Sequence, residues 1–212
     1  MCPLCQASEG TVTATDLSQG MIDDLTIRMD ASQVTNVTAL RMPAEKLDQP
    51  DRAFDTAICA LGLMYTPDPA RAVAEMARVV APGGTVAALV WGEHRSCGWA
   101  EVFPIVDARV ASQVCPMFFG TGAPNALVRI FEQAGLQDIT EHHQSEDLRF
   151  ENQAALIDAV LLGGPVALAV KRFDEATWKE VCREFLASVS AFKNDDASYS
   201  IPGEFVTVSG VV

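Results

Sequence analysis

Short runs of β-branched and apolar residues alternate, in the first half of the chain, with segments whose apolar positions recur at helical spacing. Residues 11–16 (TVTATD) predict a strand, residues 18–31 predict a helix with its apolar residues on one face, and residues 37–42 (VTALRM) predict a second strand. A strand, a helix and a strand in this order are typical of a parallel crossover. These segments therefore predict one βαβ unit.

A second unit follows with clearer boundaries. Residues 54–60 (FDTAICA) form a nearly continuous apolar run, which predicts a central strand that is covered on both faces and lies deep in the sheet. The next helix has Asp68 as its expected N-cap, Pro69 at its first position and the run at residues 82–84 (PGG) as its expected stop. Residues 85–91 (TVAALVW) predict another buried strand, which completes a right-handed crossover.

After Trp91 the pattern changes to a mixture of glycine, proline, aromatic and charged residues. The remaining predicted elements are helices at residues 99–112, 125–135, 153–162 and 175–192 and strands at residues 139–143 and 204–211. The helix at 125–135 has Asn125 as its expected cap and Gly135 as its expected stop. Together the elements predict a Rossmann-like α/β fold, with a mainly parallel sheet, helices on both faces and an antiparallel C-terminal strand.

Charge and hydropathy narrow the range of partners. Fifteen Lys and Arg residues against 28 Asp and Glu residues give a net charge of −13, which repels phosphate backbones and anionic lipids. No apolar run reaches the ~20 residues of a membrane span, and the N-terminus lacks the features of a signal peptide. We therefore expect a cytoplasmic protein that binds neither nucleic acid nor membrane.

The six cysteines do not indicate a disulfide framework or a metal site. Cys59, Cys97, Cys115 and Cys182 are scattered in apolar or mixed surroundings, where a free cysteine packs as a small hydrophobe. Cys2 and Cys5 form a C-x-x-C pair, but a second pair of ligands at useful spacing is missing. No metal is predicted.

Two longer stretches and the C-terminal strand together carry a family resemblance. They are TATDLSQGMID at residues 13–23, MPAEKLDQPDRAFDTAICALGLMYTPDPARAVAEMARVVAPGGTVAALVWG at residues 42–92, and IPGEFVTVSG at residues 201–210. In their order and spacing the chain resembles the class I S-adenosylmethionine-dependent methyltransferases, in particular the ubiquinone and menaquinone methylases. The resemblance implies S-adenosyl-L-methionine as cofactor and a small-molecule methyl acceptor as substrate.

The resemblance also implies one methyltransferase-like domain over residues 1–212. Its parts are an N-terminal stub (1–10), a cofactor-side half (11–92) and a substrate-side and C-terminal half (93–212). The residues that it implies for cofactor binding are Asp16, Leu17, Met21, Ala44, Glu45 and Leu61.

The residues themselves leave some of these roles open. An acid at the carboxyl end of a parallel strand, such as Asp16, can accept hydrogen bonds from ribose hydroxyls, but it can equally cap the helix that follows. Met21 suits either a contact with adenine or the core. The family usually has an acid just before the pair Ala44-Glu45, and here Pro43 stands there. Since proline offers neither an amide donor nor a side-chain acceptor, we expect adenine recognition that is weaker or purely main-chain.

The substrate-side half offers binding residues but no assigned catalytic residue. Trp91, His94 and Trp99 are the predicted acceptor-binding residues. His94 is the best placed of three histidines for a general base, although its neighbours Glu93 and Arg95 favour a solvent-facing loop position over that role. His142 and His143 are adjacent on a predicted strand, so they should point to opposite faces.

Five aromatic residues in and after the last strand of the second unit could either bind an aromatic acceptor or form a core under a cap. They are Trp91, Trp99, Phe103, Phe118 and Phe119.

One element of the family is missing from the sequence. A first strand and a glycine-rich turn should precede residue 11, where only MCPLCQASEG stands. We expect a truncated product, two sheet halves that close up, or another chain that fills the slot.

Three functions remain open at this point. The first is a small-molecule methyltransferase, inactive alone if the missing turn is essential. The second is a non-catalytic methyltransferase remnant that binds a partner subunit, either a second copy or another chain covering the open sheet. A nicotinamide enzyme is the third, and it too lacks its glycine fingerprint.

Overall fold

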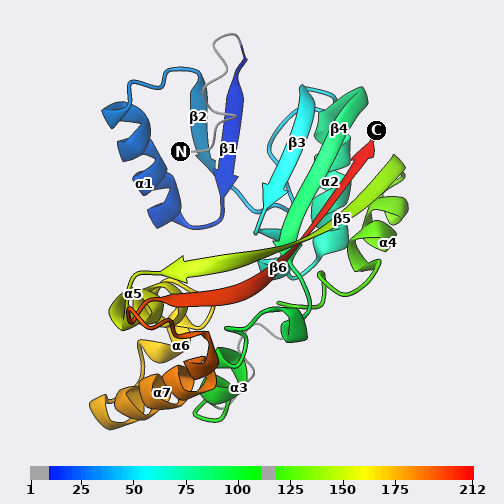
Figure 1. Cartoon of the computed structure of the whole chain (residues 1–212). Helices are drawn as coiled ribbons and strands as arrows, with labels where there is room; N and C mark the ends of the chain where they lie inside the picture. The colour runs from blue at the N-terminus through cyan, green and yellow to red at the C-terminus, as the bar shows by residue number, and fades with distance from the viewer. Residues whose placement is uncertain (1–9, 111–117) are drawn as a thin grey trace.

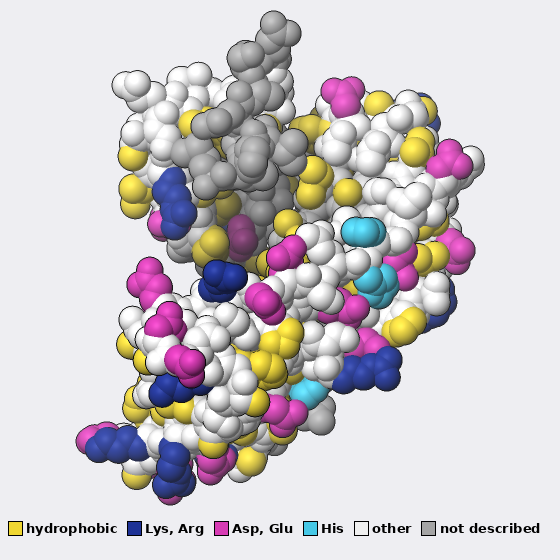
Figure 2. Space-filling view, viewed as in Figure 1, with side chains coloured by type: hydrophobic (Ala, Val, Ile, Leu, Met, Phe, Trp, Pro, Cys, Tyr) yellow, Lys and Arg dark blue, Asp and Glu magenta, His cyan; other side chains and the backbone are white. Residues whose placement is uncertain are grey.

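The computed structural model describes residues 10–110 and 118–212, which form an α/β structure (Figure 1). The Cys2–Cys5 pair, Cys115 and nearly all of the N-terminal stub lie outside the described residues. Within the described ranges no helix is long and apolar enough to cross a membrane. Acidic side chains are spread over the whole of the face seen in Figure 2, in keeping with the net charge of −13.

The first βαβ unit agrees with its prediction. Strand β1 (Val12–Asp16) is followed by helix α1 (Gln19–Ala31) and strand β2 (Val37–Arg41). The two strands are parallel and pair along their whole length, from Val12 opposite Val37 to the end of both strands. Helix α1 packs against this two-stranded sheet.

The second βαβ unit is also present. It consists of strand β3 (Phe54–Ala60), helix α2 (Pro69–Val79) and strand β4 (Val80–Trp91), and β3 and β4 are parallel. The Asp68 carboxylate accepts a hydrogen bond from the Arg71 amide at 2.9 Å, which confirms Asp68 as the N-cap.

Residues 82–84 lie inside β4 and do not end α2, so the predicted helix stop is wrong. Here the register between β3 and β4 shifts between Phe54 and Thr56, and the extra residues of β4 form a bulge. A Cβ atom on Gly84 would meet the Asp55 carbonyl oxygen at 2.5 Å. The glycine is therefore needed because β4 passes close to β3 after the bulge.

The C-terminal half adds a long antiparallel hairpin to the second unit. Strands β5 (Gln137–Phe150) and β6 (Tyr199–Val211) pair with each other, and β6 also pairs with β4, so the sheet order is β3-β4-β6-β5. The predicted antiparallel C-terminal strand is confirmed, and both strands are longer than predicted.

Helices cover one face of this sheet and the far part of the hairpin. Helix α2 and helix α4 (Ala126–Gln133) contact the sheet, on the side away from the viewer in Figure 1. Helices α3 (Val102–Asp107), α5 (Gln153–Ile157), α6 (Ala167–Val170) and α7 (Glu175–Ser188) lie around the other end of the hairpin. Gly135 adopts the left-handed conformation that ends α4, as predicted, but the Asn125 side chain makes no capping bond.

The largest correction concerns β3, which was predicted to lie deep in a single sheet. Among the described strands β3 pairs only with β4, and β1 only with β2, so the sheet is divided in two and β3 is an edge strand. The Ile58 side chain is 54% exposed. The apolar pattern correctly identified a strand, but pattern alone does not reveal whether a neighbour lies along its second edge.

The edge position of β3 can be tested with two isoleucines in the four-stranded sheet. Ile201, in β6, is fully buried, whereas Ile58 is mostly exposed. We expect Ile201→Ala to lower the free energy of unfolding by about 2–5 kcal/mol and Ile58→Ala by less than about 1 kcal/mol. Urea denaturation of both variants measures the difference. Equal losses would show that Ile58 is covered in solution.

Candidate functional site

The predicted cofactor residues lie at one end of the parallel strands. In Figure 1 the arrows of the parallel strands β1, β2, β3 and β4 all point downward, toward the far part of the β5–β6 hairpin. Asp16 is the last residue of β1, and Leu61 directly follows β3. Open α/β sheets bind their ligands at this carboxyl edge.

One of the two carboxylate oxygens of Asp16 accepts a hydrogen bond at the start of helix α1. Its Oδ1 accepts a hydrogen bond from the Ser18 amide at 2.7 Å, while the Ser18 side chain makes no capping bond. The second oxygen, Oδ2, has no partner among the described residues. The two roles left open by the sequence are thus compatible in one side chain.

Main-chain contacts hold the end of β1 in place. The Met42 amide donates to the Asp16 carbonyl at 3.1 Å, and the Arg41 Nε donates to the Leu17 carbonyl at 2.9 Å. Both donors lie at the end of β2, so hydrogen bonds to this neighbouring strand hold the turn that follows β1.

Two exposed apolar side chains stand next to this carboxylate. Leu17 is 64% exposed and Met21 is 56% exposed, which excludes the core position considered for Met21. Asp16 and Met21 also line a shallow hollow of about 260 Å³ between β1 and α1. Exposed apolar groups beside an acid match what the flat base and the hydroxyls of a nucleoside require.

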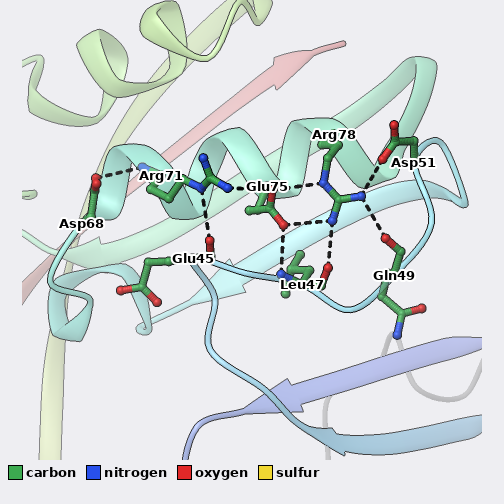
Figure 3. A network of polar contacts seen from close by, with 8 residues as sticks. All are labelled: Glu45, Leu47, Gln49, Asp51, Asp68, Arg71, Glu75 and Arg78. Carbon is green, nitrogen blue, oxygen red and sulfur yellow. Dashed lines mark hydrogen bonds and ion pairs between the residues drawn. The ribbon is translucent and has the colours of Figure 1, made fainter.

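Ala44 and Glu45 lie in the segment that connects β2 to β3. Ala44 packs against the core, and the Glu45 carbonyl accepts a hydrogen bond from Arg71 Nε at 3.3 Å. The rest of the segment is held by Glu75 and Arg78 of α2 (Figure 3). Sequence analysis considered only the boundaries and the apolar face of α2 and did not select these two residues. The signal that could have identified them is their spacing of three residues, which places the opposite charges of Glu75 and Arg78 on one helix face.

The backbone turns sharply where β3 ends. Leu61 has a φ of +55°, in the left-handed region that a branched side chain rarely adopts, and its amide donates to the Leu89 carbonyl at 2.7 Å. At the next residue, a Cβ atom on Gly62 would meet Cys59 Sγ at 2.8 Å. Such a conformation costs about 1–3 kcal/mol and is found most often at functional sites.

The predicted acceptor-binding residues meet in an aromatic cluster. Trp91 stacks on Phe205 with ring centroids 4.3 Å apart and meets Trp99 edge-on at 5.1 Å, and His94 meets Phe119 edge-on at 5.2 Å. Trp99 is only 5% exposed, whereas Trp91 and His94 are half-buried. Trp99 therefore supports the cluster from inside, and Trp91 and His94 lie at its rim.

His143, which sequence reasoning did not select, lies between two carboxylates. Its Nδ1 is 3.2 Å from Glu204 Oε1, and its Nε2 is 3.2 Å from Glu141 Oε1. His143 faces Val206 across the hairpin and His142 faces Thr207, so the two histidines point to opposite faces as predicted. Glu141, and after it Glu204, raises the pKa of the His143 imidazole above its usual value of 6.5.

Within residues 10–110 and 118–212 no group of His, Cys, Asp and Glu side chains is arranged to hold a metal ion.

Sequence comparison supports the same reading. Residues 1–88 match a family described as a methyltransferase domain. Demethylmenaquinone methyltransferase from Listeria welshimeri is 33% identical over 95 residues, which are 45% of this chain and 40% of that protein. The resemblance to the class I methyltransferases is confirmed. The chain matches less than half of the length of this curated relative.

Solved methyltransferase structures share the fold over nearly the whole chain. A putative methyltransferase from Bacillus halodurans has a TM-score of 0.57 and 16% identity, covering 95% of this chain and 82% of that one. Phosphoethanolamine N-methyltransferase 2 from Haemonchus contortus, in complex with phosphomonomethylethanolamine and S-adenosylhomocysteine, has a TM-score of 0.58 and 14% identity, covering 95% and 44%. At these identities the likeness shows the methyltransferase fold.

The charge on His143 makes stability depend on pH. Because the folded pKa is the higher one, the protonated imidazole stabilises the fold fully below about pH 6.5, and this contribution is lost as the pH rises through the folded pKa. We expect Glu141→Gln to lower the pKa of His143 more than Glu204→Gln does, measured by NMR titration of the imidazole protons. A pKa unchanged in Glu141→Gln would contradict the observed pairing.

Proposed function

We propose that the chain is an S-adenosylmethionine-dependent methyltransferase that acts on a small molecule. The observation that carries this proposal is the Asp16 carboxylate, which engages Ser18 with one oxygen and leaves the other without a partner among the described residues. An acid in this position binds ribose hydroxyls in nucleotide-binding α/β sheets. The family match over residues 1–88 supports S-adenosyl-L-methionine as the cofactor.

Each part of the cofactor has a counterpart among the site residues. Asp16 would accept hydrogen bonds from the ribose hydroxyls, and Leu17 and Met21 would contact the faces of the adenine. Main-chain groups at residues 44–45 would bind the adenine edge. The left-handed turn at Leu61 would present backbone groups to the methionine end.

The cofactor, when bound, supplies a methyl group that its sulfonium has already activated. The protein then has to hold the acceptor in line with that methyl group and keep water out. We assign the acceptor contact to the aromatic cluster, with Trp91 and His94 at its rim and Trp99 behind them. When the acceptor is a hydroxyl or an acidic carbon, His94 would take its proton as the methyl group is transferred.

Asp16→Asn separates the two functions of this side chain. Asparagine keeps an oxygen that can accept the Ser18 amide, but it removes the charge that faces the ribose. We expect calorimetric titration to show binding of S-adenosylhomocysteine by the wild type and about tenfold weaker binding by Asp16→Asn.

The matched control for this experiment is Asp23→Asn, on the exposed surface of α1, which should bind like the wild type. Thermal unfolding should be the same for both variants. An affinity unchanged in Asp16→Asn would leave this residue with the start of α1 as its only role.

The exposed edge of β3 supports a second candidate function, a methyltransferase remnant that binds a partner subunit. β3 has no strand along its second edge among the described residues, and Ile58 is 54% exposed there. An unpaired strand edge offers backbone donors and acceptors to a strand of another chain. This candidate needs no cofactor, and a failed titration would favour it.

A second copy is the simplest partner to test. We expect the wild type to self-associate in analytical ultracentrifugation as its concentration rises, and Ile58→Lys to remain monomeric because a charge cannot be buried there unpaired. Leu168→Lys is the control, since Leu168 of α6 is 75% exposed and lies away from β3. A wild type that is monomeric at every concentration would exclude a second copy as the partner.

A further inference from the structure

Helix α2 binds the main chain of the segment between β2 and β3 in a regular way (Figure 3). Leu47 is held at both of its backbone groups, because its amide donates to Glu75 Oε2 at 2.9 Å and its carbonyl accepts from Arg78 Nη2 at 2.8 Å. The Gln49 carbonyl accepts from Arg78 Nη1 at 2.8 Å. Arg71 Nε reaches the Glu45 carbonyl at 3.3 Å.

These contacts come from one face of α2. Residues 71, 75 and 78 recur at the spacing of one helix face, and Arg71 and Arg78 on this face contact the carbonyls of residues 45, 47 and 49. The helix face therefore binds every second carbonyl of the segment. The segment is therefore held through its main chain, in addition to the packing of Ala44 and Leu47 against the core.

Glu75 and Arg78 hold each other in place, because each side chain makes several hydrogen bonds. Arg78 Nε and Nη2 donate to the two oxygens of Glu75 at 3.0 and 2.8 Å, and Arg78 Nη1 also contacts Asp51 at 2.6 Å. Glu75 is 7% exposed. Arg78 holds the pKa of the Glu75 carboxyl below its usual value, so the pair stays charged.

The sequence of the segment makes this rigidity relevant to adenine. Pro43 offers no side-chain acceptor and no amide, so base recognition by this segment has to use the main chain around residues 44–45. A main-chain donor and acceptor distinguish bases only when their positions are fixed to a few tenths of an ångström.

We propose that Glu75 and Arg78 are positioning residues that determine the base selectivity of the cofactor site. They do not touch the cofactor; they fix the main chain that reads its adenine edge. This inference rests on the proposed function, since it requires that residues 44–45 contact the base.

The test compares two ligands that differ only at the base edge, S-adenosylhomocysteine and S-inosylhomocysteine. Adenine donates from its amino group and accepts at N1, whereas hypoxanthine accepts at O6 and donates from N1, so fixed main-chain groups discriminate between them. We expect the full chain to bind the adenine ligand about tenfold more tightly, as one lost hydrogen bond would give.

Arg78→Lys keeps the positive charge but cannot make the forked contacts of a guanidinium. We expect its ratio of the two affinities to fall to about one, with most of the loss on the adenine ligand. Arg109→Lys, in a partly buried ion pair with Glu184 of α7, is the control and should keep the wild-type ratio. Glu75→Gln, which retains an acceptor for the Leu47 amide, serves as the second variant and replaces Arg78→Lys if that variant does not fold.

The outcomes separate the two proposals. An unchanged ratio in a folded Arg78→Lys or Glu75→Gln variant, or equal weakening of both ligands, overturns the positioning role and leaves the proposed function in place. A wild-type ratio of about one also overturns this inference alone. A wild type that binds neither ligand overturns the proposed function and, with it, the positioning role.

Discussion

The forked contact between Arg78 and the segment after β2 connects the two parts of this molecule. Strands β1 and β2 form one sheet, and β3, β4, β6 and β5 form another, without hydrogen bonds between the two sheets among the described strands. The chain passes from one sheet to the other through residues 42–53. Because Arg78 and Glu75 hold this segment to α2, they also restrict where Asp16 and Leu17 can lie relative to the turn at Leu61.

This arrangement explains how a buried ion pair can be useful without being a large source of stability. Burying two charges has a high desolvation cost, and a well-packed apolar pair is often as stable. Glu75 is buried and Arg78 is partly exposed, and both offset part of that cost through hydrogen bonds to the backbone of Leu47. The pair thus gives specificity of position, which an apolar contact cannot supply.

The parts of the candidate site therefore differ in how firmly the surrounding structure holds their backbone. The ribose acid, the apolar neighbours and the base-binding segment lie on well-fastened backbone, and the turn at Leu61 stores strain of the kind found at binding sites. The region that would receive the methionine end is bordered by the exposed edge of β3. The proposed methyltransferase and the proposed partner-binding remnant differ in whether a strand of another chain pairs with that edge.

Much of the fold was predictable because its signals are local. The caps and periodicities of residues 11–31 and 54–91 depend on neighbours within a few positions, so they identified both βαβ units and the N-cap at Asp68. The same local character explains the error at residues 82–84. A proline and two glycines end a helix as readily as they form a bulge, and only pairing with β3 distinguishes the two.

Asp16 was placed at the carboxyl end of a strand from the sequence pattern, whereas Leu17, Ala44 and Leu61 were implied as cofactor residues by the family resemblance. Tertiary structure decided the rest. The burial of Trp99, the carboxylates on either side of His143 and the contacts of Arg78 with Leu47 and Gln49 join residues that are far apart in the chain. The exposure of β3 depends on whether a strand lies beside it, and no pattern within its seven residues carries that information. Sequence determines which backbone conformations are favourable, whereas partners across space depend on how those elements pack.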